Sequence, residues 1–204
     1  MLLIGRDLSP FVRRTATVME VLGLEYKRCK LATADAPEEV AKFNPLARVP
    51  ALVLSDDEVL FDSTAIIDHI LEIGDTEHKL LPANGQSRRD VLRVSAIATG
   101  VMEKGVAAAY EMRRRPTHLV YEPWLLRIKQ QIRDGLAYLE EAIAGSIWFT
   151  GPQLRLDDIN AVVAFDYIDQ VHPDVIAPNL RGLAALSDRA NTLPAFRNTQ
   201  WKPG

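Results

Sequence analysis

The spacing of apolar residues differs between the two halves of this chain. In the first 75 residues, short apolar runs of strand length alternate with segments in which apolar residues recur every three or four positions; the strand candidates are residues 2–4, 25–31, 52–54 and 59–61. Beyond residue 87 only the helical repeat continues, most regularly in the series Leu125, Ile128, Ile132, Leu136, Leu139 and Ile143. A mixed α/β half followed by an all-α half predicts two domains.

Turn and capping residues mark where the helices of the first half begin. Ser9-Pro10 predicts a helix start, because Ser is a preferred N-cap and Pro is favoured at the first helical position. Asp35 and Glu38 have the spacing of a capping box and predict a short helix as far as Phe43. Asp62-Ser63 precedes a helix that stops at Gly74, and residues 55–58 predict a hairpin loop.

A polar segment rich in turn-forming residues separates the mixed half of the chain from the helical half. Residues 76–86 contain a Leu-Leu-Pro and an Asn-Gly, which mark a linker. We therefore expect a first domain at residues 1–75 and a helical domain at residues 87–204. Within the helical domain a buried helix is expected from about Asp157 to Val171, with two shorter helices near residues 180–191 and 192–201.

The segment between the fourth and fifth predicted elements holds a Val49-Pro50 pair just before an apolar strand. Proline cannot donate to a sheet ladder, so it fits only the start or the edge of a strand. An ordinary trans turn is one reading of this pair, since trans is the commoner form of an X-Pro bond.

Composition excludes several classes of protein. The net charge is −3 and the isoelectric point about 5.8, which gives no electrostatic footprint for nucleic acid. No apolar run reaches membrane-spanning length, and the N-terminus lacks a signal-peptide pattern. We expect a cytoplasmic protein without a nucleic-acid or membrane partner. The four histidines show no metal-ligand spacing, so no metal is expected.

The order β-α-β-α-(Val-Pro)-β-β-α, followed by helices, resembles the glutathione S-transferase family, most closely its soluble bacterial serine type. The residues that carry the resemblance are Ser9-Pro10-Phe11, the run from Asn44 to Pro50, Asp62-Ser63, and Leu156-Asp157-Asp158-Ile159. The resemblance implies a thioredoxin-like N-terminal domain, an all-α C-terminal domain, a cis Val49-Pro50 bond and a homodimer. One departure is Arg155, which stands where the family usually has a Ser or Thr N-cap; either Asp157 caps the helix or the helix entry is shifted.

The same resemblance implies that glutathione is the co-substrate and that its thiol attacks a small electrophile. A hydroxyl donor and the positive end of a helix would both stabilise a thiolate, and Ser9 offers both. The alternative is that Ser9 only caps its helix; Tyr26 and Cys29, both on a predicted strand, are less suitable candidates. Glutathione would be held by Ser9, Arg48, Val49, Pro50, Asp62 and Ser63.

The electrophile pocket is expected from position alone, and its predicted residues are Phe11, Val106, Tyr110 and Arg113. Trp201 either covers that pocket or packs elsewhere. Two other functions remain open. One is a non-catalytic, transferase-like binding or regulatory protein; the other is a glutathione-dependent peroxide or disulfide reductase. A dithiol mechanism is disfavoured because the chain has no Cys-x-x-Cys motif.

Overall fold

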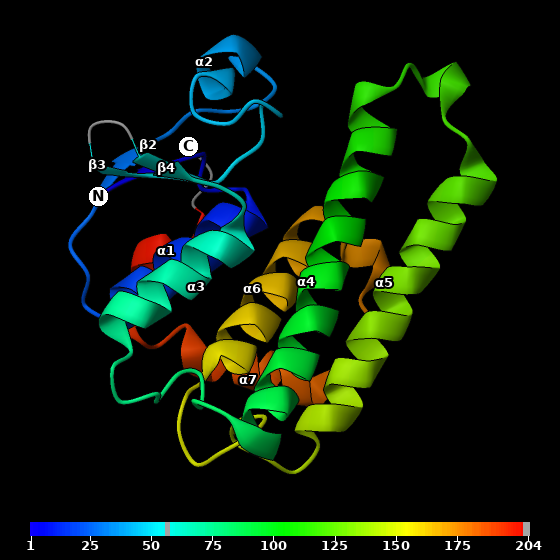
Figure 1. Ribbon diagram of the computed structural model, residues 1–204. Helices are drawn as coiled ribbons and strands as arrows, with labels where there is room; N and C mark the ends of the chain where they lie inside the picture. The colour runs from blue at the N-terminus through cyan, green and yellow to red at the C-terminus, as the bar shows by residue number, and fades with distance from the viewer. Residues whose placement is uncertain (56–57, 202–204) are drawn as a thin grey trace. The chain divides into compact units, whose positions relative to one another are not determined.

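A computed structural model describes residues 1–55 and 58–201 of the 204-residue chain, and Figure 1 gives the element labels. Its contacts divide the chain into two compact units. The first unit consists of Met1–Leu81 together with Asn191–Gly204, and the second is Pro82–Ala190. The boundary at residues 81–82 falls inside the predicted linker, whereas the last fourteen residues belong to the first unit rather than to the predicted helical domain.

The first unit is built on a four-stranded sheet with the order β2-β1-β3-β4. The strands are β1 (Leu2–Ile4), β2 (Lys27–Cys29), β3 (Ala51–Ser55) and β4 (Glu58–Leu60). Strand β1 is parallel to β2 and antiparallel to β3, which is antiparallel to β4. The centre of the predicted hairpin loop, residues 56–57, lies outside the described residues.

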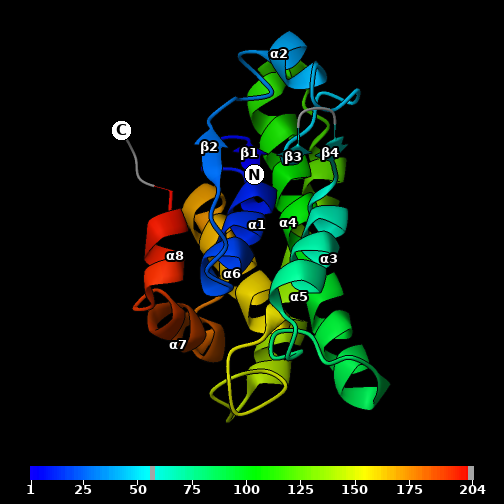
Figure 2. The same ribbon diagram turned by 60° about the vertical axis from the view of Figure 1, so that its left-hand side comes forward.

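Four helices accompany this sheet: α1 (Pro10–Val21), α2 (Pro37–Ala41), α3 (Ser63–Gly74) and α8 (Pro194–Thr199). Figures 1 and 2 show α1 and α3 side by side against one face of the sheet, and Leu3 and Ile4 of β1 are fully buried. Helix α2 starts at Pro37 with Ala36 as its N-cap and no side-chain cap bond, so the prediction that Asp35 and Glu38 form a capping box was wrong.

The C-terminal segment belongs to the first unit because α8 packs on α1. The Thr17 and Thr199 hydroxyls lie 2.8 Å apart in a buried hydrogen bond, and Phe196 is completely buried. The Arg13 guanidinium donates to the side-chain oxygen of Asn191 at 3.2 Å. These contacts join residues about 180 positions apart, so no local pattern in the sequence could have indicated them.

The second unit is all helical, as predicted. Its elements are α4 (Gly85–Arg114), the 3₁₀ turn η1 (Thr117–Leu119), α5 (Glu122–Ile143), α6 (Leu156–Val171), the 3₁₀ turn η2 (Pro173–Val175) and α7 (Arg181–Ala190). Residues 82–190 are all described, and none of them lies in a strand. Hydrogen bonds from Arg155 to Ser87 and between His172 and the Gly105 carbonyl link the two ends of α6 to α4, so these helices run parallel.

Buried carboxylates organise the N-terminus of α6. The N-cap is Arg155, whose backbone N–H donates to Asp158, and the backbone N–H of Phe149 donates to the other oxygen of Asp158, both at 2.8 Å. Asp157 accepts a hydrogen bond from the Thr150 hydroxyl at 2.7 Å and lies within the first turn, so it is not the N-cap. Burial, followed by the charge of Asp157, raises the pKa of Asp158 to about 7.

Candidate functional site

The topology of the first unit brings four chain segments to one edge of its sheet. Strands β1 and β2 are parallel, so both end at this edge; β3 is antiparallel to them and begins there, and β4 ends there. The turn that leads into α1, the Val49-Pro50 pair and the Asp62-Ser63 pair therefore follow or precede neighbouring strands. Neighbouring strands lie about 4.8 Å apart, so the predicted glutathione residues of this unit are brought together.

Two helices also begin at this edge. Helix α1 follows β1, and α3 follows β4. A helix N-terminus carries roughly half a positive charge and has backbone N–H groups without intrahelical acceptors. The edge therefore offers two places where a negative group is stabilised, and these are the places where Ser9 and Ser63 lie.

Ser9 is the N-cap of α1, and its hydroxyl oxygen accepts the backbone N–H of Val12 at 3.4 Å. This distance is longer than a typical N–H···O hydrogen bond, so the capping interaction is weak. Capping uses a lone pair of the oxygen and leaves the hydroxyl hydrogen available to a ligand. The two roles considered for Ser9 are therefore compatible: it caps the helix as an acceptor and can serve a thiolate as a donor.

The Val49-Pro50 bond is cis, which confirms the prediction; the Phe61-Asp62 bond is also cis. Val49 precedes β3, so its backbone groups lie just outside the sheet ladder. The loop before it is held by Asn44, a buried residue whose amide donates to the Arg48 carbonyl at 3.0 Å and accepts the Leu46 N–H at 3.0 Å. The sequence analysis placed Asn44 in a family motif but did not predict that its side chain holds this loop by hydrogen bonds.

Gly5 allows the end of β1 to lie close to Val49. It has a φ of +137°, and a Cβ built on it would lie 2.4 Å from Val12 Cγ2 and 2.9 Å from Val49 Cβ. Any side chain at this position would displace either α1 or the loop that carries Val49. The absence of a side chain at Gly5 therefore fixes the spacing between Ser9's helix and the cis bond.

Asp62 and Ser63 form the N-terminus of α3. Asp62 is the N-cap, and its carboxylate accepts the Thr64 N–H at 2.8 Å. Ser63 is only 2% exposed, and its hydroxyl makes a long 3.4 Å bond to the Asp62 carboxylate. The hydroxyl can exchange this weak bond for a ligand carboxylate, while the exposed Asp62 can meet a cation.

Charged residues flank the β1–α1 turn. The Asp7 carboxylate forms ion pairs with Arg28 at 2.6 Å and with Lys30 at 2.7 Å, joining the turn before Ser9 to β2. The Arg28 contact is an ion pair without good hydrogen-bond alignment. Sequence reasoning missed this cluster because its members lie more than twenty positions apart. Arg48 is exposed at the same edge and makes no ion pair within the described residues.

The alternative thiol-activating residues are less suited to the role. The Tyr26 hydroxyl donates to Glu20, which lies in the second half of α1, far along the helix from Ser9. Burial, then the charge of Glu20, raises the pKa of Tyr26 well above its usual range. Cys29 ends β2, and its carbonyl accepts the Gly5 N–H.

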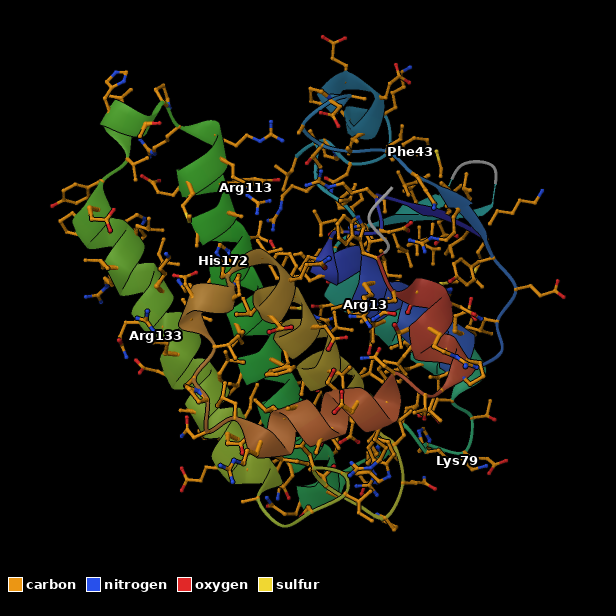
Figure 3. The ribbon with its side chains drawn as sticks, turned by 180° about the vertical axis from the view of Figure 1, so that it is seen from behind. Arg13, Phe43, Lys79, Arg113, Arg133 and His172 are labelled. Carbon is orange, nitrogen blue, oxygen red and sulfur yellow. The ribbon has the colours of Figure 1, made fainter. Side chains whose placement is uncertain are left out.

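The predicted electrophile-pocket residues divide between the units. Phe11 is half-buried on α1 in the first unit. Val106, Tyr110 and Arg113 lie on α4 in the second unit at the i, i+4 and i+7 positions of one helix face. Figure 3 shows Arg113 near the C-terminal end of that helix. These four residues stay a prediction, and so does the role of Trp201, which is half-buried after α8.

No group of three or more His, Cys, Asp or Glu side chains in the described part of the chain could hold a metal ion. Among residues 1–55 and 58–201, no helix is both long and apolar enough to cross a membrane.

Comparison with known proteins identifies the family. The model of the glutathione S-transferase N-terminal domain matches residues 3–78. The uncharacterized GST-like protein YibF of Escherichia coli is 33% identical over 140 residues, which are 69% of this chain and 68% of YibF.

Solved structures agree over almost the whole chain. A glutathione transferase family member from Pseudomonas fluorescens, solved with bound glutathione, is 28% identical and has a TM-score of 0.88 over 99% of both chains. A glutathione S-transferase from Methylobacterium radiotolerans, in complex with glutathione sulfonate, has a TM-score of 0.91 over 100% of this chain and 96% of its own; at 24% identity it supports the fold. This chain belongs to the glutathione S-transferase family.

Proposed function

We propose that the protein is a glutathione transferase of the serine type, which ionises the thiol of glutathione and directs it at a small electrophile. One observation carries the proposal: Ser9, the cis Val49-Pro50 bond and Ser63 lie at one sheet edge where two helices begin. The relative from Pseudomonas fluorescens with bound glutathione supports it.

The chemistry of glutathione fits the groups at this edge. Its γ-glutamyl end carries an ammonium and a carboxylate on one carbon. Asp62 is an exposed carboxylate that would pair with the ammonium, and the Ser63 hydroxyl at the N-terminus of α3 would donate to the carboxylate. The Val49 backbone, outside the sheet ladder, would pair with the cysteinyl backbone beside Pro50, and Arg48 would lie near the glycyl carboxylate.

Ser9 supplies the thiol activation. A free thiol has a pKa of about 8.5 and is mostly protonated at neutral pH. The Ser9 hydroxyl would donate to the thiolate more strongly than to the neutral thiol, and the N-terminus of α1 adds its positive potential. Both effects lower the pKa of the bound thiol. Its proton passes to water, and the sulfur then forms a bond to the electrophilic carbon as the leaving group departs.

The electrophile itself would contact Phe11, Val106, Tyr110 and Arg113, with the Tyr110 hydroxyl placed to donate to developing negative charge. This part of the proposal rests on the position of these residues in the chain. The protein would act as a homodimer, as the family resemblance implies.

A panel of thiol-reactive electrophiles assayed with glutathione tests the function. We expect saturable turnover with some members of the panel, reduced in Ser9→Ala and unchanged in Ser146→Ala, which removes an exposed hydroxyl from the second unit. Glutathione binding by calorimetry without turnover of any electrophile would instead support the non-catalytic alternative. No binding at millimolar glutathione would contradict the proposal entirely.

A further inference from the structure

The connection between α4 and α5 exposes an unusual concentration of apolar side chains. Met112, Leu119, Tyr121 and Trp124 are 44%, 55%, 64% and 45% exposed. Apart from Val120, which is half-buried, every residue from 112 to 124 is exposed. We call residues 112–124 the tip. Single exposed apolar residues are normal, but a cluster of this kind indicates an interaction surface.

The tip stands clear of the other helices of the second unit. Helix α6 ends at Val171, and its C-cap His172 bonds to the Gly105 carbonyl, so the last nine residues of α4 extend beyond that contact. Figures 1 and 3 both show the α4–α5 connection projecting past α6 and α7. Its exposed side chains therefore lie on a convex end, not in a groove.

The tip is also basic. Arg113, Arg114 and Arg115 are consecutive and exposed, and Glu122 is the only carboxylate of residues 112–124. The buried Glu111 pairs with Arg115 at 2.7 Å and accepts the Tyr121 N–H at 3.2 Å. This leaves Arg113 and Arg114 without an ion pair within the described residues, although the whole chain carries a net charge of −3.

We propose that the tip docks on the surface of an anionic lipid bilayer. Tyr and Trp side chains are favoured at membrane–water interfaces because they combine an apolar ring with a polar group. Arginines next to them are attracted to anionic headgroups. Surface docking of this kind needs no spanning helix, so it is consistent with the absence of one among the described residues. It departs from our expectation of no membrane partner, which rested on the lack of a spanning segment.

The shape and charge of the tip disfavour other occupants. A second copy bound through the same surface around a two-fold axis would bring the arginines of both copies together, which is repulsive. An acidic peptide would match the charge, but peptides that present apolar anchors are usually bound in grooves, and the tip is convex. The surface of an anionic bilayer is flat, negatively charged and partly apolar. It therefore fits the convex shape, the positive charge and the exposed apolar side chains of the tip.

Co-sedimentation with lipid vesicles tests the proposal on the full chain. We expect binding to vesicles that contain phosphatidylglycerol and much weaker binding to pure phosphatidylcholine vesicles, with a loss of binding at high salt. Each charge near an anionic surface contributes about a factor of five in affinity. Arg114→Glu changes the charge by two units and should weaken binding about 25-fold. The double variant Tyr121→Ser/Trp124→Ser should weaken binding by a similar factor at low salt and at intermediate salt, where the wild type still binds.

Two matched controls make the same chemical changes elsewhere in the second unit. Arg181→Glu reverses an exposed charge on α7, and Ile147→Ser removes an apolar side chain that is 63% exposed beyond the opposite end of α5. Neither should change vesicle binding by more than the non-specific effect of net charge. Circular dichroism and glutathione binding should be unchanged in all variants, because none of these residues belongs to the proposed glutathione site.

Three results would overturn the proposal. The first is no binding of the wild type to phosphatidylglycerol vesicles at low salt. The second is equal binding by the tip variants and the controls. The third is a different occupant: a lower mass in light scattering for the tip variants would show contact with a second copy, and binding of polyglutamate in preference to the vesicles would show an acidic polypeptide partner.

Discussion

Replacing Asp158 by asparagine should change the way in which the free energy of unfolding depends on pH. In the native protein both oxygens of Asp158 accept backbone N–H groups at the N-terminus of α6. Burial, and then the neighbouring charge of Asp157, raises the pKa of Asp158 from 3.8 to about 7. A carboxyl with a higher pKa in the folded chain binds its proton more tightly there than in the unfolded chain.

The sign of the effect follows from this difference. The stability that Asp158 contributes is fully present below about pH 4, where both states are protonated, and is lost as the pH rises through about 7. Each pKa unit corresponds to 1.36 kcal/mol, so the loss is on the order of 4 kcal/mol. Asparagine does not titrate. It keeps one accepting oxygen and loses the other, which costs about 1–3 kcal/mol at every pH.

Urea unfolding of wild type and Asp158→Asn between pH 4.5 and 8, followed by circular dichroism, measures this. The stability of the wild type relative to the variant should decrease as the pH rises from 4.5 and should level off above about pH 7. Asp157→Asn is the matched control. It removes the negative charge that is the second cause of the raised pKa of Asp158, so the decrease in stability should be complete at a lower pH. A relative stability that stays constant or grows with pH would refute the reasoning. It would show that the two N–H groups lower the pKa of Asp158 by more than burial raises it.

Three further predictions concern the first unit and the assembly. Ser63→Ala should weaken glutathione binding by about 1.5–3 kcal/mol in calorimetry with little loss of stability, because its hydroxyl makes a single long bond to the described residues; unchanged affinity would remove Ser63 from the site. Gly5→Ala should lower both the melting temperature and glutathione affinity, whereas Gly145→Ala, which also has a positive φ but no atom within 4 Å of its added Cβ, should affect only stability; equal effects on affinity would contradict the role given to Gly5. Light scattering should report about twice the 22.7 kDa chain mass, and a mass near one chain at micromolar concentration would exclude the proposed homodimer.

Local sequence signals predicted most of the fold. The N-cap and proline of α1, the glycine at the end of α3 and the helical repeat of α5 all appear close to their expected places. Each of these signals acts within about one turn of chain, which is why a single sequence contains it. The cis bond was predicted through the family resemblance that the order of the surrounding elements carries, because Val-Pro alone would favour trans.

What the sequence could not indicate depends on contacts between distant residues. The ion pairs of Asp7, the docking of α8 on α1 and the exposure of the tip are all of this kind. The capping box predicted at Asp35 failed for a different reason. The spacing of Asp35 and Glu38 is that of a capping box, but the helix begins without a side-chain cap bond. The site residues at the starts of α1, β3 and α3 were predicted through the family resemblance; the residues themselves left a structural role open for each.

The pKa of the thiol in bound glutathione tests the central claim most directly. It is measured from the ultraviolet absorbance of the thiolate against pH, for wild type and Ser9→Ala. The bound thiol should titrate below the pKa of about 8.5 of a free thiol, and loss of the hydroxyl should raise its pKa by about one to two units, the equivalent of a charge-assisted hydrogen bond. Unfolding by denaturant should show a separate loss of about 1 kcal/mol from the N-cap. If the two titration curves coincide and only the unfolding midpoint moves, Ser9 is a cap alone and does not activate the thiol.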